Sequence, residues 1–171
     1  MKVLSAIGGG LAGACALTLL HEITRRIDKD APRMDLLGRE AIAQGLRFAG
    51  QNPPDSDKLQ KVTLLGDILS NTLYYSLAAA GHKKYVMPKG TVLGLVAGLG
   101  ALFLPKPMGL NPAHSNRTLK TQVLTTSFYL VGGLVASLVA KKLEKKSEKN
   151  EKWNKKLNRL NLQRYKSLGA S

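Results

Sequence analysis

The sequence predicts an all-α integral membrane protein, a four-helix transmembrane bundle with an interfacial amphipathic helix in its first connection and a basic helical tail. The first observation is that four apolar blocks, three of them close to the length of about 20 residues that a spanning helix needs, alternate with charged connections. The second is the tail, residues 141–171, which holds eleven Lys and Arg against three Glu. Much of the formal net charge of +15 therefore lies outside the apolar blocks.

The predicted bundle occupies residues 1–140, with spans at about 3–21, 60–81, 86–104 and 121–140. The third block reaches spanning length only if Lys89 extends its ammonium group to the interface, and a re-entrant segment is the alternative there. A cleaved signal peptide is the alternative for the first block, because the small residues around Cys15 resemble a cleavage site. The chain has one cysteine, which excludes an internal disulfide.

Small residues recur every four positions in three of the blocks. Because apolar surface gains nothing by leaving hydrocarbon, close backbone approach at small residues is a main way for helices to associate in a membrane. The rows predict closely packed helices, and they also suit a homo-oligomer. They consist of Gly9 and Gly13, then Gly90, Gly94 and Gly98, and finally Gly132, Ala136 and Ala140.

The first connection contains a segment with helical periodicity, residues 30–50, in which Asp30 is a candidate N-cap with Pro32 close behind. Its apolar side indicates a helix that lies in the membrane surface or folds back on the bundle. The stretch QNPPDSD (51–57) then breaks the chain, and Asp55 or Ser56 is expected to cap the second spanning helix.

The distribution of positive charge predicts the orientation. With four spans both termini share a side, and that side carries fifteen Lys and Arg against eleven on the other. Since cytoplasmic segments carry the excess of Lys and Arg, both termini are expected in the cytoplasm, and we expect the membrane to be a bacterial inner membrane.

Polar side chains of three expected helices fall at a similar depth in the membrane. An ionised Asp in hydrocarbon costs about 2.5–3.5 kcal/mol at a helix centre, so Asp67 should have a partner, and Arg25 is the expected one. This cluster has two interpretations, an ion pair that fixes the helix register or a proton-linked or substrate-binding site. Its members are His21, Glu22, Arg25, Asp67, Asn71 and Thr125.

The tail suggests the preferred function, a non-enzymatic accessory or scaffold protein that contacts anionic lipid headgroups, RNA or an acidic protein. A tail that only enforces the membrane orientation is the alternative. The expected contact residues are Lys141, Lys142, Lys145, Lys146, Trp153, Lys155, Lys156 and Arg159.

Two other functions stay open, and a soluble nucleic-acid-binding protein is excluded by the apolar blocks. One is a small proton- or cation-linked transporter or channel that uses Asp67 and Glu22, and the other is a membrane enzyme acting on a lipid, with His21 in acid–base chemistry. We expect no catalytic residue, cofactor or metal site, because HEITR lacks the second histidine of a zinc-protease helix. His82 and His114 are also expected on opposite sides of the membrane.

Overall fold

A computed structural model describes residues 1–168 of the chain, with side chains through residue 163. In this part of the chain there are six α-helices and no strand, which confirms the all-α prediction. The helices are α1 (Val3–Ile27), α2 (Met34–Phe48), α3 (Ser56–Ser76), α4 (Val86–Phe103), α5 (Ala113–Asn116) and α6 (Leu119–Leu168). Two 3₁₀ turns, Leu77–Ala79 and Lys83–Tyr85, join α3 to α4.

Three helices are long and apolar enough to cross a membrane: α1, the segment Lys83–Phe103 that contains α4, and the first part of α6. They correspond to three of the four predicted spans. The remaining predicted span coincides with α3, which is long enough but is not among the three. Its first turns contain Asp57, Lys58 and Lys61, and Asp67 follows near its middle. The four-span prediction is therefore confirmed in part.

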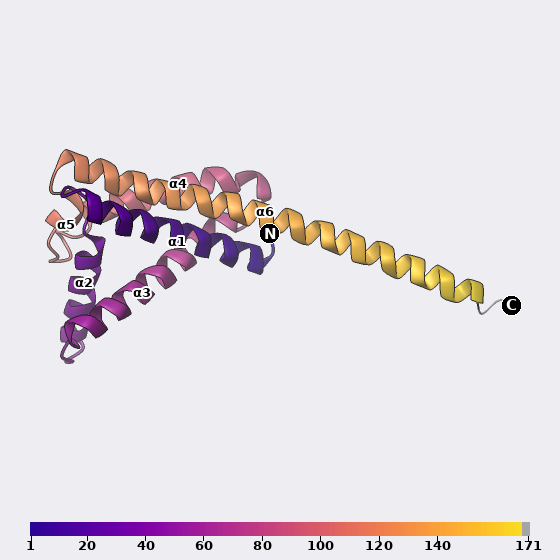
Figure 1. Cartoon of the computed structure of the whole chain (residues 1–171), viewed down its shortest axis with the longest axis horizontal. Helices are drawn as coiled ribbons and strands as arrows, with labels where there is room; N and C mark the ends of the chain where they lie inside the picture. The colour runs from indigo at the N-terminus through magenta and orange to yellow at the C-terminus, as the bar shows by residue number, and fades with distance from the viewer. Residues whose placement is uncertain (169–171) are drawn as a thin grey trace.

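The helices follow one long axis, with an exception at α2 and α3. Figure 1 shows α1, α4 and α6 lying along the bundle, whereas α3 slants away from α1 and α2 crosses the open end. Helices α1, α2 and α3 form the three sides of a triangle. Of the two buried side chains of α2, Leu37 belongs to the apolar side that the sequence predicts for this segment, whereas Ala43 lies outside it.

Glycine rows hold α6 against both of its long neighbours, as the four-residue spacing predicts. A Cβ atom built on Gly13 would lie 2.5 Å from the carbonyl oxygen of Gly132 on α6, and one built on Gly94 would lie 2.7 Å from that of Tyr129. Both distances are far shorter than an ordinary contact of 3.4 Å or more. No other residue fits these two seams without moving a helix.

Side-chain hydroxyl groups attach α3 to the rest of the bundle. Tyr75 Oη donates to the carbonyl oxygen of Tyr129 at 2.8 Å, and Tyr74 Oη donates to that of Leu93 at 2.9 Å. Ser76 Oγ lies 2.7 Å from the carbonyl oxygen of Thr72 in its own helix and 3.2 Å from that of Ala6 on α1, and its one proton is shared between them. The C-terminal half of α3 is thus bonded to α1, α4 and α6, and its N-terminal half diverges.

The last part of α6 leaves the bundle as a continuous helix, which we call the arm (residues 141–168). It rises about 42 Å at 1.5 Å per residue, and Figure 1 shows it continuing the direction of the bundle. Residues 149–163 are all exposed. The last three residues of the predicted tail lie outside the described residues.

Three glutamates fix the base of the arm to the chain start and to the connection before α4. The backbone nitrogen of Lys2 donates to Glu144 at 2.9 Å, and its Nζ lies 2.9 Å from a carboxylate oxygen of Glu151. Lys83 forms an ion pair with Glu148. The N-terminus and the arm therefore start from the same end of the bundle.

The two predicted helix caps have different outcomes. Asp55 caps α3, because its carboxylate accepts a hydrogen bond from the backbone nitrogen of Lys58 at 2.9 Å. Asp30 does not cap α2, which begins four residues later at Met34. Instead the Asp30 carboxylate pairs with Arg117 at 3.2 Å, and its carbonyl oxygen accepts from Thr121 at 2.8 Å, so it anchors the first connection to the start of α6.

Candidate functional site

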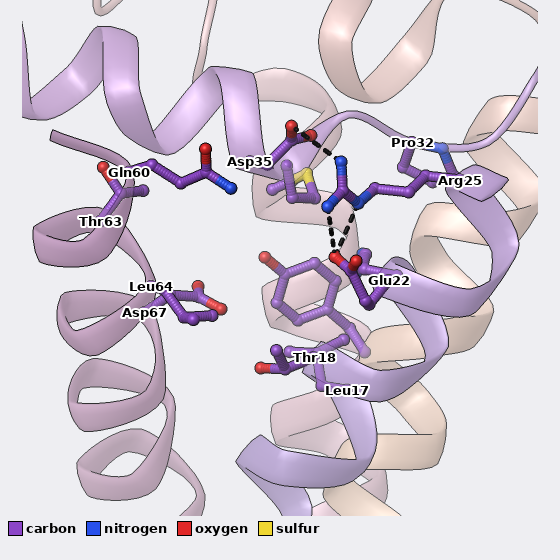
Figure 2. Close-up of a pocket in the computed structure, with 13 residues that line it drawn as sticks. Leu17, Thr18, Glu22, Arg25, Pro32, Asp35, Gln60, Thr63, Leu64 and Asp67 are labelled. Carbon is purple, nitrogen blue, oxygen red and sulfur yellow. Dashed lines mark hydrogen bonds and ion pairs between the residues drawn. The ribbon is translucent and has the colours of Figure 1, made fainter. Parts of the chain in front are cut away.

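A cavity of about 100 Å³ occupies the angle between α1 and α3. Leu17 through Arg25 supply its α1 wall, Gln60 through Asp67 its α3 wall, and α2 closes its open end with Met34 and Asp35. Tyr129 of α6 also lines it. Figure 2 shows the side chains of the two walls facing each other across this space. Four of the six predicted cluster residues line it: His21, Glu22, Arg25 and Asp67.

The end of α1, with the sequence LLHEITRR, forms an ionic network within its own helix. Glu22 accepts from Arg25 at 2.7 Å and from Arg26 at 2.6 Å, three and four residues further along. Residues at these spacings are neighbours on a helix surface, so the pairing needs no other element. Glu22 is therefore matched by two guanidinium groups.

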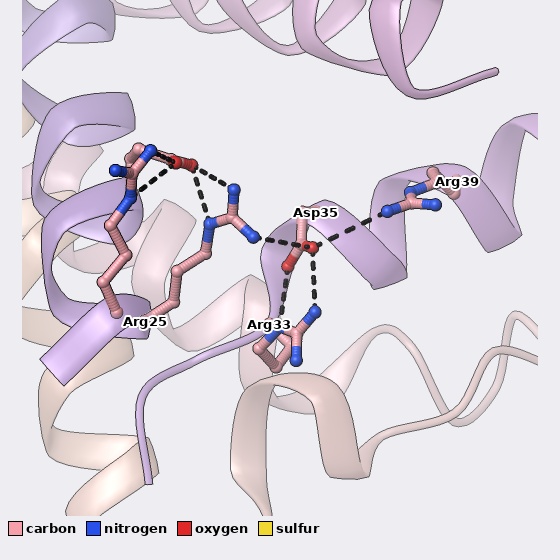
Figure 3. Close-up of polar contacts among 6 residues, drawn as sticks. Arg25, Arg33, Asp35 and Arg39 are labelled. Carbon is pink, nitrogen blue, oxygen red and sulfur yellow. Dashed lines mark hydrogen bonds and ion pairs between the residues drawn. The ribbon is translucent and has the colours of Figure 1, made fainter. Parts of the chain in front are cut away.

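Asp35, in the first turn of α2, connects this network to the first connection. Figure 3 shows its carboxylate among three guanidinium groups. Arg33 lies at 3.0 Å, Arg25 at 3.6 Å and Arg39 at 4.0 Å. Burial raises the pKa of this carboxyl, but the hydrogen bond from Arg33 and the charges of Arg33 and Arg25 outweigh burial and hold it below its usual range. Asp35 is thus ionised at neutral pH and ties α2 to α1.

Asp67 does not pair with Arg25, contrary to the prediction. In the described part of the chain Arg25 makes its ion pairs with Glu22 and Asp35, and Asp67 accepts a hydrogen bond from Nδ2 of Asn71 at 2.8 Å. The physical reason is that Arg25 has a carboxylate one turn away on its own helix and a second at the start of α2. Asp67 therefore lines the cavity with the Asn71 amide as a hydrogen-bond donor. No cation among the described residues lies within ion-pair distance of its carboxylate.

His21 and Thr18 both present polar atoms to the cavity. Nε2 of His21 is buried without a hydrogen-bond partner among the described residues, whereas Oγ1 of Thr18, also buried, is directed at the Asp67 carboxylate as a donor. The imidazole ring meets the rings of Phe128 and Tyr129 edge-on, with centroids 5.2 and 5.9 Å apart. A buried polar atom without a partner is costly, so His21 Nε2 is a candidate for contact with a bound molecule.

Thr125 lies apart from the cavity. Its hydroxyl oxygen lies 2.8 Å from the carbonyl oxygens of both Ser115 and Thr121 and shares its one proton between them, which holds α5 against α6. Asn71 remains beside Asp67 but lines a second, larger space.

Sequence reasoning missed several residues that line the cavity. Asp35 follows Arg33 in a first helical turn, a position that favours an acidic residue, and this was the available signal. Thr18 precedes His21 by three residues on the same helix face. Gln60, Thr63 and Tyr129 gave no signal, because their placement depends on the crossing angle of α3.

The expected contact residues of the tail all lie on the arm. Each is exposed, and Trp153 is 57% exposed. They are Lys141, Lys142, Lys145, Lys146, Trp153, Lys155, Lys156 and Arg159.

Comparisons with protein families, with curated proteins and with solved structures find no match to this chain. Its class therefore rests on the helices themselves. Three helices, packed together on glycine seams, have the length and apolar composition of membrane spans, which indicates an integral membrane protein.

Proposed function

We propose that this chain is a membrane-anchored scaffold whose arm docks an acidic helical protein. The observation that supports the proposal is the unbroken α6, in which one helix passes from a membrane-spanning segment into an exposed basic arm. A continuous helix fixes the distance and direction at which its far end is presented. In this view the bundle is the anchor and the arm is the docking element.

The charges of the arm are segregated along its length. Its three glutamates lie at positions 144, 148 and 151, one face of the helix, and all contact the chain start or Lys83. Beyond them, residues 152–163 contain Lys152, Lys155, Lys156 and Arg159 and no acidic residue. The far part of the arm therefore attracts acidic surfaces.

The direction of the arm favours a soluble partner over the lipid surface. If α1, α4 and α6 cross the membrane along the bundle axis, the arm continues away from the bilayer, as its course in Figure 1 indicates. Basic residues gain from anionic headgroups only within about a Debye length, near 8–10 Å at physiological salt. Most of an arm about 42 Å long lies beyond that distance.

An apolar seam on the arm suggests that the partner is a helix. Trp153, Leu157 and Leu160 stand at spacings of four and three residues, the spacing of a helix-pairing face, and all three are exposed. Leu162 lies on the opposite side. A seam of this kind flanked by lysines fits an amphipathic helix with acidic margins, whereas RNA recognition relies on several stacked aromatic residues.

Trp153 provides the test, because it is the only tryptophan of the chain. The protein is reconstituted in phosphatidylcholine vesicles and titrated with a tryptophan-free acidic amphipathic peptide, with single-stranded RNA, or with added anionic lipid. We expect the peptide to shift Trp153 emission to shorter wavelength, and the shift to weaken as salt is raised. Leu157→Asn should reduce peptide binding, and Leu162→Asn is the matched control. A shift with RNA or anionic lipid but not with peptide would contradict the proposal.

We place both termini on the cytoplasmic side, on the excess of Lys and Arg at that end. This orientation requires α3 to return the chain across the membrane. The hydroxyl bonds of Tyr74, Tyr75 and Ser76 support such a crossing, because they give α3 polar contacts with α1, α4 and α6.

The placement of Asp67 supports the alternative function of a transporter, whereas the placement of Glu22 does not. Glu22 is engaged by Arg25 and Arg26, so it has no free charge to offer a transported cation. Asp67 keeps an unmatched carboxylate on the cavity. Flux of protons in reconstituted vesicles that Asp67→Asn abolishes would favour this second function.

A further inference from the structure

Asp67 lies where two cavities meet. It lines the polar cavity between α1 and α3, and it also lines a larger groove between α2, α3 and α4. The groove has a volume of about 560 Å³, within the range of small-molecule sites. The two spaces, a small chamber with many polar lining residues and a larger, mostly apolar groove, therefore share Asp67 in their linings, together with Met34 and Tyr129.

The groove is apolar on the side of α4 and carries polar groups on the side of α3. Its α4 wall includes Val96, Ala97 and Ala101, and Leu37 of α2 adds to it. Gly100, in the same wall, has room for a side chain, because a Cβ there would come no closer than 3.5 Å to Leu104. A hydrocarbon chain matches this lining.

The polar chamber matches a primary ammonium group. Glu22 and Asp35 are paired with arginines, so Asp67 is the carboxyl group of the chamber without an ion-pair partner among the described residues. Near it, His21 Nε2 lacks a partner in the described part of the chain, and a neutral imidazole can accept there. Thr18 Oγ1 is directed at Asp67 as a donor and keeps its own lone pairs as acceptors. An ammonium group has three N–H donors, and the chamber offers three acceptors.

We propose that the protein binds a single-chain amphiphile with a primary amine head, the head at Asp67 and the chain in the groove between α2, α3 and α4. This site is independent of the arm and does not depend on its partner. A trimethylated head lacks N–H donors, and an alcohol lacks the charge, so both should bind less well.

The test compares photoreactive probes in the intact protein embedded in phosphatidylcholine nanodiscs. Dodecylamine, dodecanol and dodecyltrimethylammonium each carry the same diazirine near the chain end and are present at equal mole fraction. Labelling of groove peptides from α3 and α4 is normalised to labelling of the lipid-facing side of α1. We expect the amine to label the groove about tenfold more than the alcohol, and unlabelled dodecylamine, but not its trimethyl analogue, to compete.

Two variant pairs locate the site. Asp67→Asn should reduce amine labelling to the level of the alcohol, whereas Asp57→Asn, on the same helix and exposed, should leave it unchanged. Gly100→Leu should fill the groove and abolish labelling, whereas Gly66→Leu, where nothing lies within 4 Å of a Cβ, should not. Equal labelling by all three probes in the unmodified protein, or competition by the trimethyl analogue, overturns the proposal without any variant.

Discussion

Replacing Gly94 by alanine tests the packing of α4 against α6. A Cβ at this position would lie 2.7 Å from the carbonyl oxygen of Tyr129 and 2.8 Å from Cα of Leu130, several tenths of an ångström inside ordinary contact. Both atoms belong to the backbone, so no side-chain rotation removes the overlap. The two helices must separate.

The size of the effect follows from two opposing contributions. Overpacking costs about 1–3 kcal/mol, and a backbone clash belongs near the upper end because the whole seam opens and its dispersion contacts weaken. The helix preference of alanine over glycine returns about 1 kcal/mol. We therefore expect Gly94→Ala to lower the free energy of unfolding by about 2 kcal/mol.

Gly100→Ala on the same helix is the matched control. Its Cβ has no contact shorter than 3.5 Å, so the helix preference acts alone, and we expect a gain of up to about 1 kcal/mol. Unfolding is followed by circular dichroism during titration of dodecyl sulfate into micelles of the purified protein. If Gly94→Ala is as stable as the unmodified chain, or if both variants lose stability equally, α4 does not face α6 through this row.

Three further predictions concern the polar contacts. Arg25→Gln and Asp35→Asn should be non-additive in a double-mutant cycle, with a coupling of about 1 kcal/mol, whereas Arg25→Gln and Asp67→Asn should add. The pKa of Asp35 is lowered in the folded state, so its contribution to stability is complete above the unfolded-state pKa of about 4. That contribution declines as the pH falls through the folded-state pKa. Asp35→Asn should therefore remove this part of the dependence of stability on acid pH. Tyr75→Phe should cost about 0.5–1.5 kcal/mol, measured by the same titration, because it removes the bond to the Tyr129 carbonyl, and an unchanged stability would contradict that contact.

The features of the fold that sequence reasoning predicted are those with a strong local pattern. The glycine rows are one example, since a spacing of four places small residues on one helix face whatever the neighbour is. The Asp55 cap is another, because its bond to Lys58 is made within a single turn. Both predictions needed only the local sequence, within a few residues of each feature.

The pairing of Asp67 could not be predicted in the same way. Matching depths in the membrane do not say how far α3 leans from α1, and the lean opens a cavity where an ion pair was expected. The competition for Arg25 was visible in part, since Glu22 stands three residues before it. The position of Asp35 depends on where α2 begins. The candidate cap at Asp30 predicts a start that is too early, because α2 begins at Met34.

The continuous α6 was also beyond the sequence pattern, which separates an apolar block from a charged tail. Lysines at close spacing repel each other, and this weakens an isolated helix. The structure places Glu144, Glu148 and Glu151 against the bundle end, so that the helix is held at its base by contacts from distant parts of the chain.

The most direct test of the scaffold proposal is whether the arm stands away from the bilayer. In a Cys15→Ser background, single cysteines at positions 153 to 160 are spin-labelled in reconstituted vesicles, and collision rates with oxygen and with a water-soluble nickel complex are measured. An arm in solvent predicts high nickel accessibility without helical periodicity. A 3.6-residue alternation, with positions 153, 157 and 160 exposed to oxygen and protected from nickel, would show the arm lying on the membrane and contradict the account.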